Sequence, residues 1–255
     1  MAGLGGGVIL VPALLFLHDI SEGFSWVTPQ NIVGISLVVM VFTALSSSIS
    51  YFRNKRIDYK SGSIFLVGSI PGGIIGAYIN QFASGDIFSF YLGLLVIITS
   101  CMFFVKKKVI YLPQAGRKGN IQREVVMNGK KFHYSFSFLA AFLVAFTVGV
   151  LSGLFGIGGG SLMVPAMMLL FGFPIHIATA TSMFMILFSS LFSSATHIAL
   201  GHVPWEYVWL FIPSAWLGGT AGAKLNQLLK GKILEWILRI LLIIIGIRLI
   251  WQGIG

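Results

Sequence analysis

The sequence of 255 residues contains few charged residues: only 9% are Asp, Glu, Lys or Arg, whereas 56% are hydrophobic. Charged residues make up about a quarter of an ordinary soluble domain, so this composition excludes one. Apolar stretches of about 20 residues recur along the chain, each long enough to cross a hydrocarbon core of roughly 30 Å. We therefore expect an all-α polytopic membrane protein, because an outer-membrane barrel would show short alternating segments instead.

Cysteine and acidic residues are also scarce. Cys101 is the only cysteine and lies in an apolar stretch, which excludes disulfides and cysteine-based metal sites. None of the seven Asp and Glu residues lies deep inside an apolar stretch, so a proton relay of paired carboxylates is not expected. Metalloprotease, Walker and hydrolase motifs are absent as well. The sequence therefore predicts neither an enzyme nor a cofactor nor a metal site.

Basic residues, in contrast, give the chain a net charge of +10. Eight of the 17 Lys and Arg lie in one polar segment, residues 106–133. A basic loop beside apolar spans is first a signal of a cytoplasmic location. We therefore interpret the charge as a topology signal and expect no nucleic-acid partner.

Two similar glycine-rich stretches divide the chain. GLGGGVILVPALLFL runs from Gly3 to Leu17, and GIGGGSLMVPAMMLLF runs from Gly156 to Phe171, at an offset of 153 residues. The segments that follow also match, now at an offset of 146, as in the GGxxGA sequences that begin at Gly72 and Gly218. We infer a first transmembrane repeat at 1–105, a basic linker at 106–133 and a second repeat at 134–255.

The spans are expected at 31–52, 61–81, 87–105, 134–155, 176–200, 206–229 and 233–252, with short half-helices after the two glycine clusters. The second repeat has a complete span, 134–155, before its glycines, and the first has almost nothing there. Either the native chain begins upstream of Met1, or the first repeat lacks its leading span.

Two topologies are compatible with the duplication. If every apolar stretch crosses once, the repeats are parallel and the turn with Lys224 and Lys232 lies outside. If the half-helix and the next segment enter and leave on one side, the repeats are inverted. All Lys and Arg apart from Arg239 and Arg248 then face the cytoplasm. We favour inversion because it obeys the positive-inside rule.

The glycine clusters predict helices that are broken inside the membrane. Irregular backbone is tolerated there only where it is buried in protein or lines a wet cavity. A half-helix presents free N–H groups and a positive dipole end, which attract an anion. The alternative is that the glycines only let helices cross closely. Two clusters in register, each followed by a proline, favour a substrate site for an anion.

The candidate site residues share a position on the glycine clusters or on the hydroxyl-rich spans that flank them. Serine hydroxyls can donate hydrogen bonds to an oxyanion without a fixed charge in the membrane, although such hydroxyls often bond their own helix. The substrate-binding candidates are Gly5, Gly6, Gly7, Gly158, Gly159, Gly160, Ser161, Ser47, Ser48, Ser193, Ser194, His197 and Tyr51, with Pro12 and Pro165 at the helix breaks.

These motifs resemble the TauE/SafE sulfite exporter family, also called the 4-toluene sulfonate uptake permease family. The resemblance is carried by the doubled GxGGGxxxxP motif, the hydroxyl-rich helices ending at Tyr51 or His197, the turns at 57–59 and 203–205, and the GGxxGA helices. The sequence departs from the pattern at Pro204, where the first repeat has Asp58. The resemblance implies a permease of the bacterial inner membrane for sulfite, thiosulfate or organosulfonates.

The sequence thus predicts a secondary transporter for a small sulfur-containing anion, embedded in the lipid bilayer and without a cofactor. A passive anion channel and a membrane-embedded accessory protein of sulfur metabolism are the alternatives. The helix faces lined by small residues are compatible with a homodimer.

Overall fold

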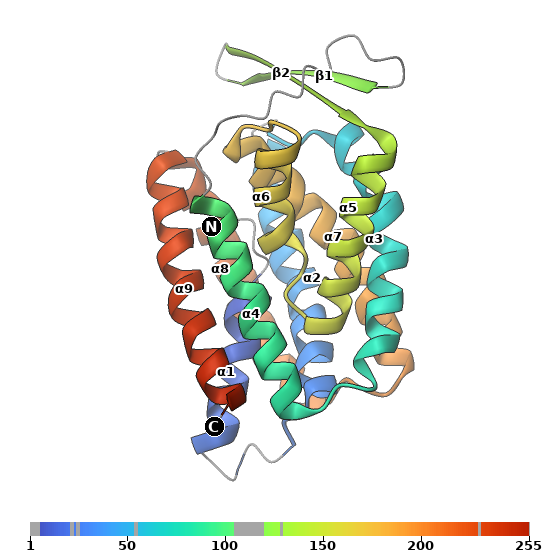
Figure 1. Cartoon of the computed structure of the whole chain (residues 1–255), viewed down its shortest axis with the longest axis vertical. Coiled ribbons are helices and arrows are strands. Elements are labelled where there is room, and N and C mark those ends of the chain that lie inside the picture. The colour runs from blue at the N-terminus through green and yellow to red at the C-terminus, as the bar shows by residue number, and fades with distance from the viewer. Residues whose placement is uncertain are drawn as a thin grey trace.

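The structure is a computed structural model, and it describes residues 6–20, 23, 26–53, 56–104, 120–127, 130–228 and 231–254. Of the candidate site residues, Gly5 lies outside this described part. Helices dominate the described residues, with one pair of strands (Figure 1). In chain order the elements are α1 (Gly7–Ile20), α2 (Pro29–Arg53), α3 (Tyr59–Asn80), α4 (Gly85–Phe104), β1 (Asn120–Met127), β2 (Lys130–Ser137), α5 (Phe138–Phe155), α6 (Gly160–Leu170), α7 (Ile175–Ala199), α8 (Trp205–Leu228) and α9 (Gly231–Ile254).

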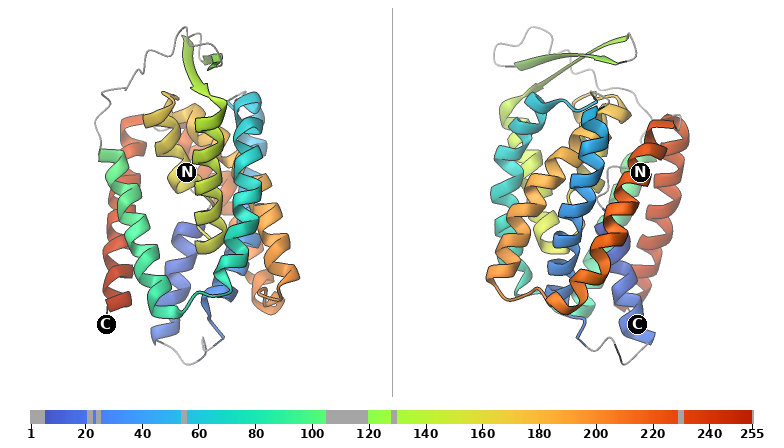
Figure 2. Two further views of the ribbon diagram at one scale, coloured as in Figure 1. Left: turned by 45° about the vertical axis from the view of Figure 1, so that its right-hand side comes forward. Right: turned by 180° about the vertical axis from the view of Figure 1, so that it is seen from behind.

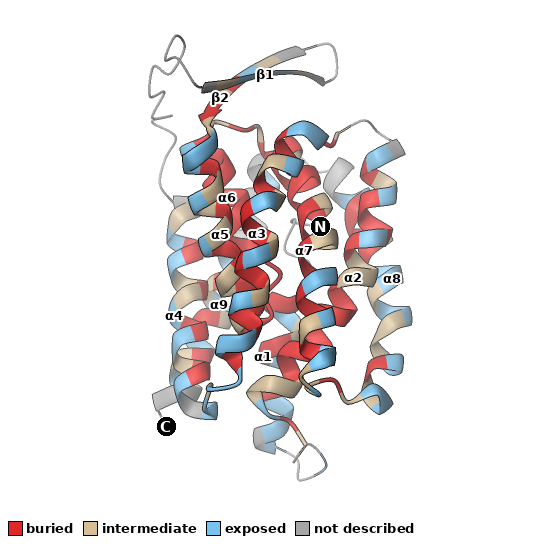
Figure 3. Cartoon of the chain, turned by 90° about the vertical axis from the view of Figure 1, so that its right-hand side faces the viewer, coloured by how far each residue is buried: buried red, intermediate tan, exposed pale blue. Residues whose placement is uncertain are grey.

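Among the described residues, four helices, α2, α3, α5 and α7, are long and apolar enough to cross a membrane. Large apolar side chains such as Trp209, Leu210 and Leu217 are exposed on the outside of the bundle. Figure 3 shows this separation, with buried residues facing the interior and exposed ones facing outward. The chain is therefore a mostly helical, membrane-embedded protein, as predicted.

The helix boundaries repeat with the same spacing as the sequence. α2 and α7 each contain 25 residues, and they begin 146 residues apart, at Pro29 and Ile175. The same spacing of 146 residues separates the start of α3 from that of α8, and the start of α4 from that of α9. The similar segments thus form similar elements.

The counterparts run in opposite directions through the bundle. In Figures 1 and 2, α2 and α4 run toward the end that carries the strands, which we call the hairpin end, whereas α7 and α9 run away from it. α3 runs away from the hairpin end and α8 runs toward it. The ends of α2 and α8 and the starts of α3 and α9 therefore lie at the hairpin end, and the α3–α4 and α7–α8 connections lie at the opposite end.

Small residues let α3 and α5 pack closely. A Cβ added at Gly68 would lie 2.5 Å from the carbonyl oxygen of Phe142 on α5, and one added at Gly72 or Gly76 would overlap with backbone atoms of α5. α5 contributes its own glycine at 149, where a Cβ would overlap with Ser69 of α3. Larger residues would push the two helices apart, so this contact fixes the depth at which α5 ends.

The segment before α5 contains strands, which the sequence analysis did not predict. β1 and β2 form an antiparallel hairpin in which Asn120 pairs with Ser137 and Met127 with Lys130. The expected all-α class therefore holds for the bundle only, and Tyr134 lies on β2 rather than at the start of a span. The reason is an alternating pattern in β2, where Tyr134 and Phe136 are buried against the bundle and His133 is exposed.

Candidate functional site

The chain breaks between α5 and α6 at three glycines with positive φ. The φ angles of Gly156, Gly158 and Gly159 are 67°, 74° and 61°. Residues other than glycine rarely adopt this region of backbone conformation. Gly156 ends α5, and its N–H donates to the Ser152 oxygen at 2.8 Å. α6 then begins at Gly160, so the predicted break lies where the glycine cluster stands.

α6 is a short helix that starts inside the bundle. It has 11 residues, or about 16 Å at 1.5 Å per residue, too little to cross a membrane. In Figure 1 it begins part-way along the bundle and runs back toward the hairpin end, where α5 began. Met163 is the first residue of α6 whose N–H bonds four residues back, to Gly159 at 2.7 Å. The N–H groups before it form the positive end of the helix.

The two glycine clusters contact each other. A Cβ on Gly7, the first residue of α1, would overlap with the carbonyl oxygen of Gly156 and would lie 2.8 Å from the Ser36 hydroxyl. Ser36 of α2 donates a hydrogen bond to that same Gly156 oxygen at 2.6 Å. Gly6, with a φ of 84°, precedes α1. The start of α1 and the break before α6 therefore contact each other inside the helical bundle.

The prolines lie inside the helices rather than at the breaks. Pro12 is within α1 and Pro165 within α6, each at the sixth position of its helix. A proline there has no N–H to bond the residue four positions earlier, so Pro165 leaves the carbonyl oxygen of Ser161 without this bond. The expected helix breaks are thus formed by the glycines upstream.

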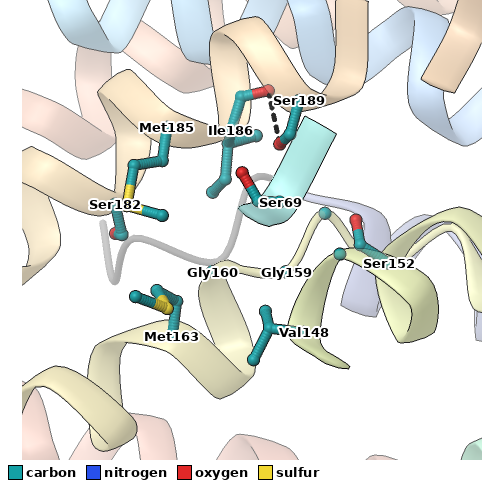
Figure 4. A pocket seen from close by; sticks show the side chains of 12 residues that line it. Ser69, Val148, Ser152, Gly159, Gly160, Met163, Ser182, Met185, Ile186 and Ser189 are labelled. Atoms are coloured by element: carbon teal, nitrogen blue, oxygen red, sulfur yellow. Dashed lines mark hydrogen bonds between the residues drawn. The ribbon is translucent and has the colours of Figure 1, made fainter. Parts of the chain in front are cut away.

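A pocket lies at the start of α6, between α3, α5 and α7 (Figure 4). The pocket is small: about 10 Å³ is open to the centre of a water-sized molecule, roughly the space for one water, and the empty volume reaches about 240 Å³ only when the open solvent at its mouth is counted. The surface that faces this space is mostly apolar, and Met163, Met185, Val148 and Ile186 line it together with four serines and several glycines. The polar lining comprises Ser69 of α3, Ser152 of α5, Ser182 and Ser189 of α7, and Gly158, Gly159 and Gly160.

The lining carries no ionisable side chain, so its electrostatics come from the backbone and from hydroxyl groups. The Ser69 hydroxyl is buried, with the residue 4% exposed, and has no hydrogen-bond partner in the described part of the chain. The Ser161 hydroxyl, one residue beyond the lining, is likewise buried and unpartnered there. Ser182 donates to its own helix at 2.9 Å, and Ser189 makes a long bond of 3.4 Å.

Several predicted site residues lie outside this pocket, at contacts between helices. Ser47 of α2 donates to the Gly219 oxygen of α8 at 2.9 Å, and Ser194 donates within α7 to Leu191 at 3.0 Å. Ser193 stands against Gly73 of α3.

Three other predicted residues also lie outside the lining and are buried in the bundle. Ser48 has a buried hydroxyl without a partner among the described residues, and Tyr51 is buried. His197 is within hydrogen-bond distance of the Gly153 oxygen (3.1 Å) and of His202 (3.0 Å). Of the predicted residues, the structure brings Gly158, Gly159 and Gly160 to the pocket, with Ser161 next to them.

Ser69 and Ser152 line the pocket, although the sequence analysis did not name them as candidates. Ser152 could have been found from its place four residues before Gly156, at the end of the span that enters the break. Ser69 follows Gly68, the first of the α3 glycines that pack on α5, and that proximity was its only signal.

Comparison with known proteins agrees with this picture of a membrane-embedded chain. The chain is 46% identical over 254 residues to the probable membrane transporter protein YunE of Bacillus subtilis, which covers 100% of this chain and 93% of the relative. It is 26% identical to a probable membrane transporter protein of Haemophilus influenzae, over 90% of this chain and 80% of the relative. The probable membrane transporter protein YfcA of Escherichia coli is 24% identical to this chain, over 98% of this chain and 84% of the relative.

No solved structure matches the chain. The sequence model of the family described as sulfite exporter TauE/SafE matches residues 1–249, which is nearly the whole chain. Both this match and the curated relatives indicate a membrane transporter rather than an enzyme. The chain belongs to the TauE/SafE sulfite exporter family of membrane transporters.

Proposed function

We propose that this protein is a secondary transporter that moves a small sulfur-containing oxyanion, such as sulfite or an organosulfonate, across the bacterial cytoplasmic membrane. The observation that carries the proposal is the pocket at the start of α6. There, the positive end of a half-helix meets serine hydroxyls from α3, α5 and α7, and the lining holds no charged side chain. Helix N-termini favour anions, and neutral donors add hydrogen bonds to oxyanions.

The unpartnered Ser69 hydroxyl supports a ligand at this place. A buried polar group without a partner costs roughly 1–3 kcal/mol, so a substrate that accepts its hydrogen bond is favoured there. The neutral lining further favours exchange, because an anion held by hydroxyls and backbone dipoles is released more readily than one held by a buried cation.

We propose further that the repeats are inverted. The opposite directions of α2 and α7, α3 and α8, and α4 and α9 support this arrangement (Figure 2). Broken helices between inverted repeats are the common plan of secondary transporters, in which one part moves against the other around a central site. In this proposal α5 and α6 enter from one end and return to it.

The distribution of charge supports an orientation with the hairpin end in the cytoplasm. Arg56 and Lys60 follow the end of α2, and Lys224 lies in the last turns of α8, which are at the hairpin end (Figure 1). Glu206 lies in the first turn of α8, at the opposite end. Short cytoplasmic loops are rich in Lys and Arg, so this asymmetry favours the hairpin end as the cytoplasmic one.

The substrate can be tested with purified protein. A ligand that binds only the folded protein raises its stability, so sulfite, sulfate, thiosulfate, taurine and sulfoacetate are compared by thermal shift. A selective shift that disappears in a Ser69→Ala variant supports the site. Equal thermal shifts with all five anions, unchanged in Ser69→Ala, would contradict this site.

Transport is tested by counterflow in proteoliposomes. A carrier loaded with unlabelled substrate accumulates labelled substrate transiently, because its site exchanges one molecule for another. A passive channel shows no such accumulation, so a flat trace with measurable efflux would replace the transporter by a channel.

A further inference from the structure

A buried carboxylate at the hairpin end joins three parts of the fold. Asp58 is the N-cap of α3, and its side chain is 1% exposed. It accepts hydrogen bonds from the backbone and the hydroxyl of Ser61 on α3. Arg123 of β1 donates to it from Nη2 at 2.6 Å and from Nε at 3.3 Å, and the Tyr134 hydroxyl of β2 donates at 2.6 Å. Both strands of the hairpin thus hold the same carboxylate.

The charges of this cluster depend on one another. Burial raises the pKa of Asp58, but the hydrogen bonds from Arg123, Ser61 and Tyr134 outweigh it and hold the pKa below its ordinary value. The hydrogen bond to Asp58 in turn raises the pKa of Arg123. Both groups are therefore ionised at neutral pH. Removing one partner of a buried ion pair leaves an uncompensated charge, which weakens the attachment of the hairpin.

Asp58 also contacts α7, one of the helices that line the pocket. The backbone N–H of Asp58 donates to the Thr181 hydroxyl of α7 at 3.1 Å. Thr181 is followed by Ser182, which lines the pocket. The cluster therefore lies one residue away from the site along α7, on the side of the hairpin end.

Aromatic rings extend this contact to the turn that follows α6. The ring of Tyr134 lies 4.0 Å from that of Phe173, between α6 and α7. Phe136 packs on Phe65 of α3, with ring centroids 5.3 Å apart, and on Phe171 at 5.7 Å. These rings hold β2 over the ends of α3, α6 and α7. The hairpin is thus attached by apolar contacts around one ion pair.

We propose that the hairpin β1–β2 is a gate over the hairpin-end side of the pocket, and that the Asp58–Arg123–Tyr134 cluster is the latch that keeps it closed. This inference rests on the proposed function in two respects: that the pocket at α6 is where the anion binds, and that the hairpin end faces the cytoplasm. With the latch closed, β2 covers the path from the cytoplasm to Ser182. Release of Arg123 from Asp58 opens that path.

The test measures access to the pocket and requires no knowledge of the substrate. In a Cys101→Ser background, Ser182→Cys places a single thiol in the lining. A membrane-impermeant maleimide is added to inverted vesicles, in which the cytoplasmic side faces the reagent. We expect Arg123→Ala to raise the labelling rate at least tenfold. Glu124→Gln is the matched control, because Glu124 is exposed on the same strand and its neighbour is His133, 3.9 Å away.

Tyr134→Phe removes one hydrogen bond to Asp58 and keeps the ring, so it should give an intermediate rate and serves where Arg123→Ala fails to insert. Equal rates in the parent, Arg123→Ala and Tyr134→Phe overturn the latch. Such a result leaves the anion site intact, because the thermal shifts with anions report on it separately. Conversely, faster labelling without any anion-dependent shift supports the gate and contradicts the substrate assignment.

Discussion

Ser47 and Ser193 occupy equivalent positions in the two halves of the chain and contact equivalent glycines. Ser47 donates to the oxygen of Gly219, and Ser193 stands where a Cβ of Gly73 would lie. In each half, a serine hydroxyl of the long hydroxyl-rich helix thus contacts the glycine-rich helix of the other half, from α2 to α8 and from α7 to α3. These two serines hold the halves together instead of lining the pocket.

This packing predicts a specific rescue. Gly73→Ala should destabilise the protein by about 1–3 kcal/mol, because the new methyl group overlaps with the Ser193 hydroxyl. Ser193→Ala should restore most of the loss, since the Ser193 Cβ would lie 3.7 Å away. Gly219→Ala should not be rescued by Ser47→Ala, because there the added Cβ overlaps with the Ser46 hydroxyl and lies 2.7 Å from the backbone oxygen of Thr43. Thermal unfolding of the single and double variants measures both pairs, Gly73 with Ser193 and Gly219 with Ser47. Rescue at neither site, or at both sites, would contradict this packing.

A second prediction concerns the hydroxyl of Ser69. Ser69→Ala should weaken substrate binding roughly 10-fold to 100-fold, the loss expected for a hydrogen bond to a charged group of about 1.5–3 kcal/mol. Stability without substrate should rise, by up to about 1–3 kcal/mol, because the variant removes a buried hydroxyl that has no partner among the described residues. Ser214→Ala is the control, since Ser214 is exposed on α8 and bonds only its own helix. The Kd for the anion and the Tm without it separate the two effects, and a lower Tm with unchanged Kd would remove Ser69 from the site.

A third prediction separates backbone strain from crowding at the helix break. Gly158 and Gly172 have nearly the same φ, 74° and 72°, so alanine is strained at both, by roughly 1–2 kcal/mol. Only at Gly158 does the added Cβ overlap with a neighbour, the Met40 sulfur, whereas nothing lies within 4 Å at Gly172. Gly158→Ala should therefore abolish transport and lower the Tm further, and Gly172→Ala should retain transport. Equal losses would place the cost in the backbone alone.

The break itself could be predicted from the sequence because glycine leaves a clear physical signal. Glycine at four of five consecutive positions disfavours a helix, and α6 begins at the last glycine of its cluster. The start of α1 at Gly7 follows from the same reason. Repetition of the motif then located its counterpart without any structural information.

The choice of hydroxyls could not be predicted in the same way. Ser189 and Ser193 are both buried serines of α7, one turn apart, yet only Ser189 lines the pocket. Which of them faces the site depends on how α7 is rotated against α3, and that is fixed by contacts between distant segments. Ser69 was missed for this reason, because its helix is placed by glycines that fit α5.

The β-hairpin was missed because its apolar pattern is short and lies in a basic segment. The aromatic residues of β2 alternate with polar ones, which is typical of a half-buried strand. Their burial comes from the surface of the bundle rather than from a second sheet. A search for period-two aromatic patterns beside the spans would have found β2.

The last prediction concerns the acid sensitivity of the latch. The pKa of Asp58 is lowered from its ordinary value of 3.8: burial raises it, and the hydrogen bonds from Arg123, Ser61 and Tyr134 more than offset that rise. A carboxylate with a lowered pKa stabilises the folded protein fully above its unfolded pKa, and this stabilisation is lost as the pH falls through the folded pKa. We therefore expect that the Tm of the parent protein decreases when the pH is lowered below about 4, in part through Asp58.

Asp58→Asn should lower the Tm at pH 7, because Arg123 loses its partner, and should reduce the further decrease of the Tm in acid. Glu206→Gln, at the exposed start of α8, should leave both unchanged. Parallel Tm curves for the parent and Asp58→Asn between pH 7 and pH 3 would show that the carboxylate is not held by these bonds, since a group with an ordinary pKa in both states contributes no such pH dependence.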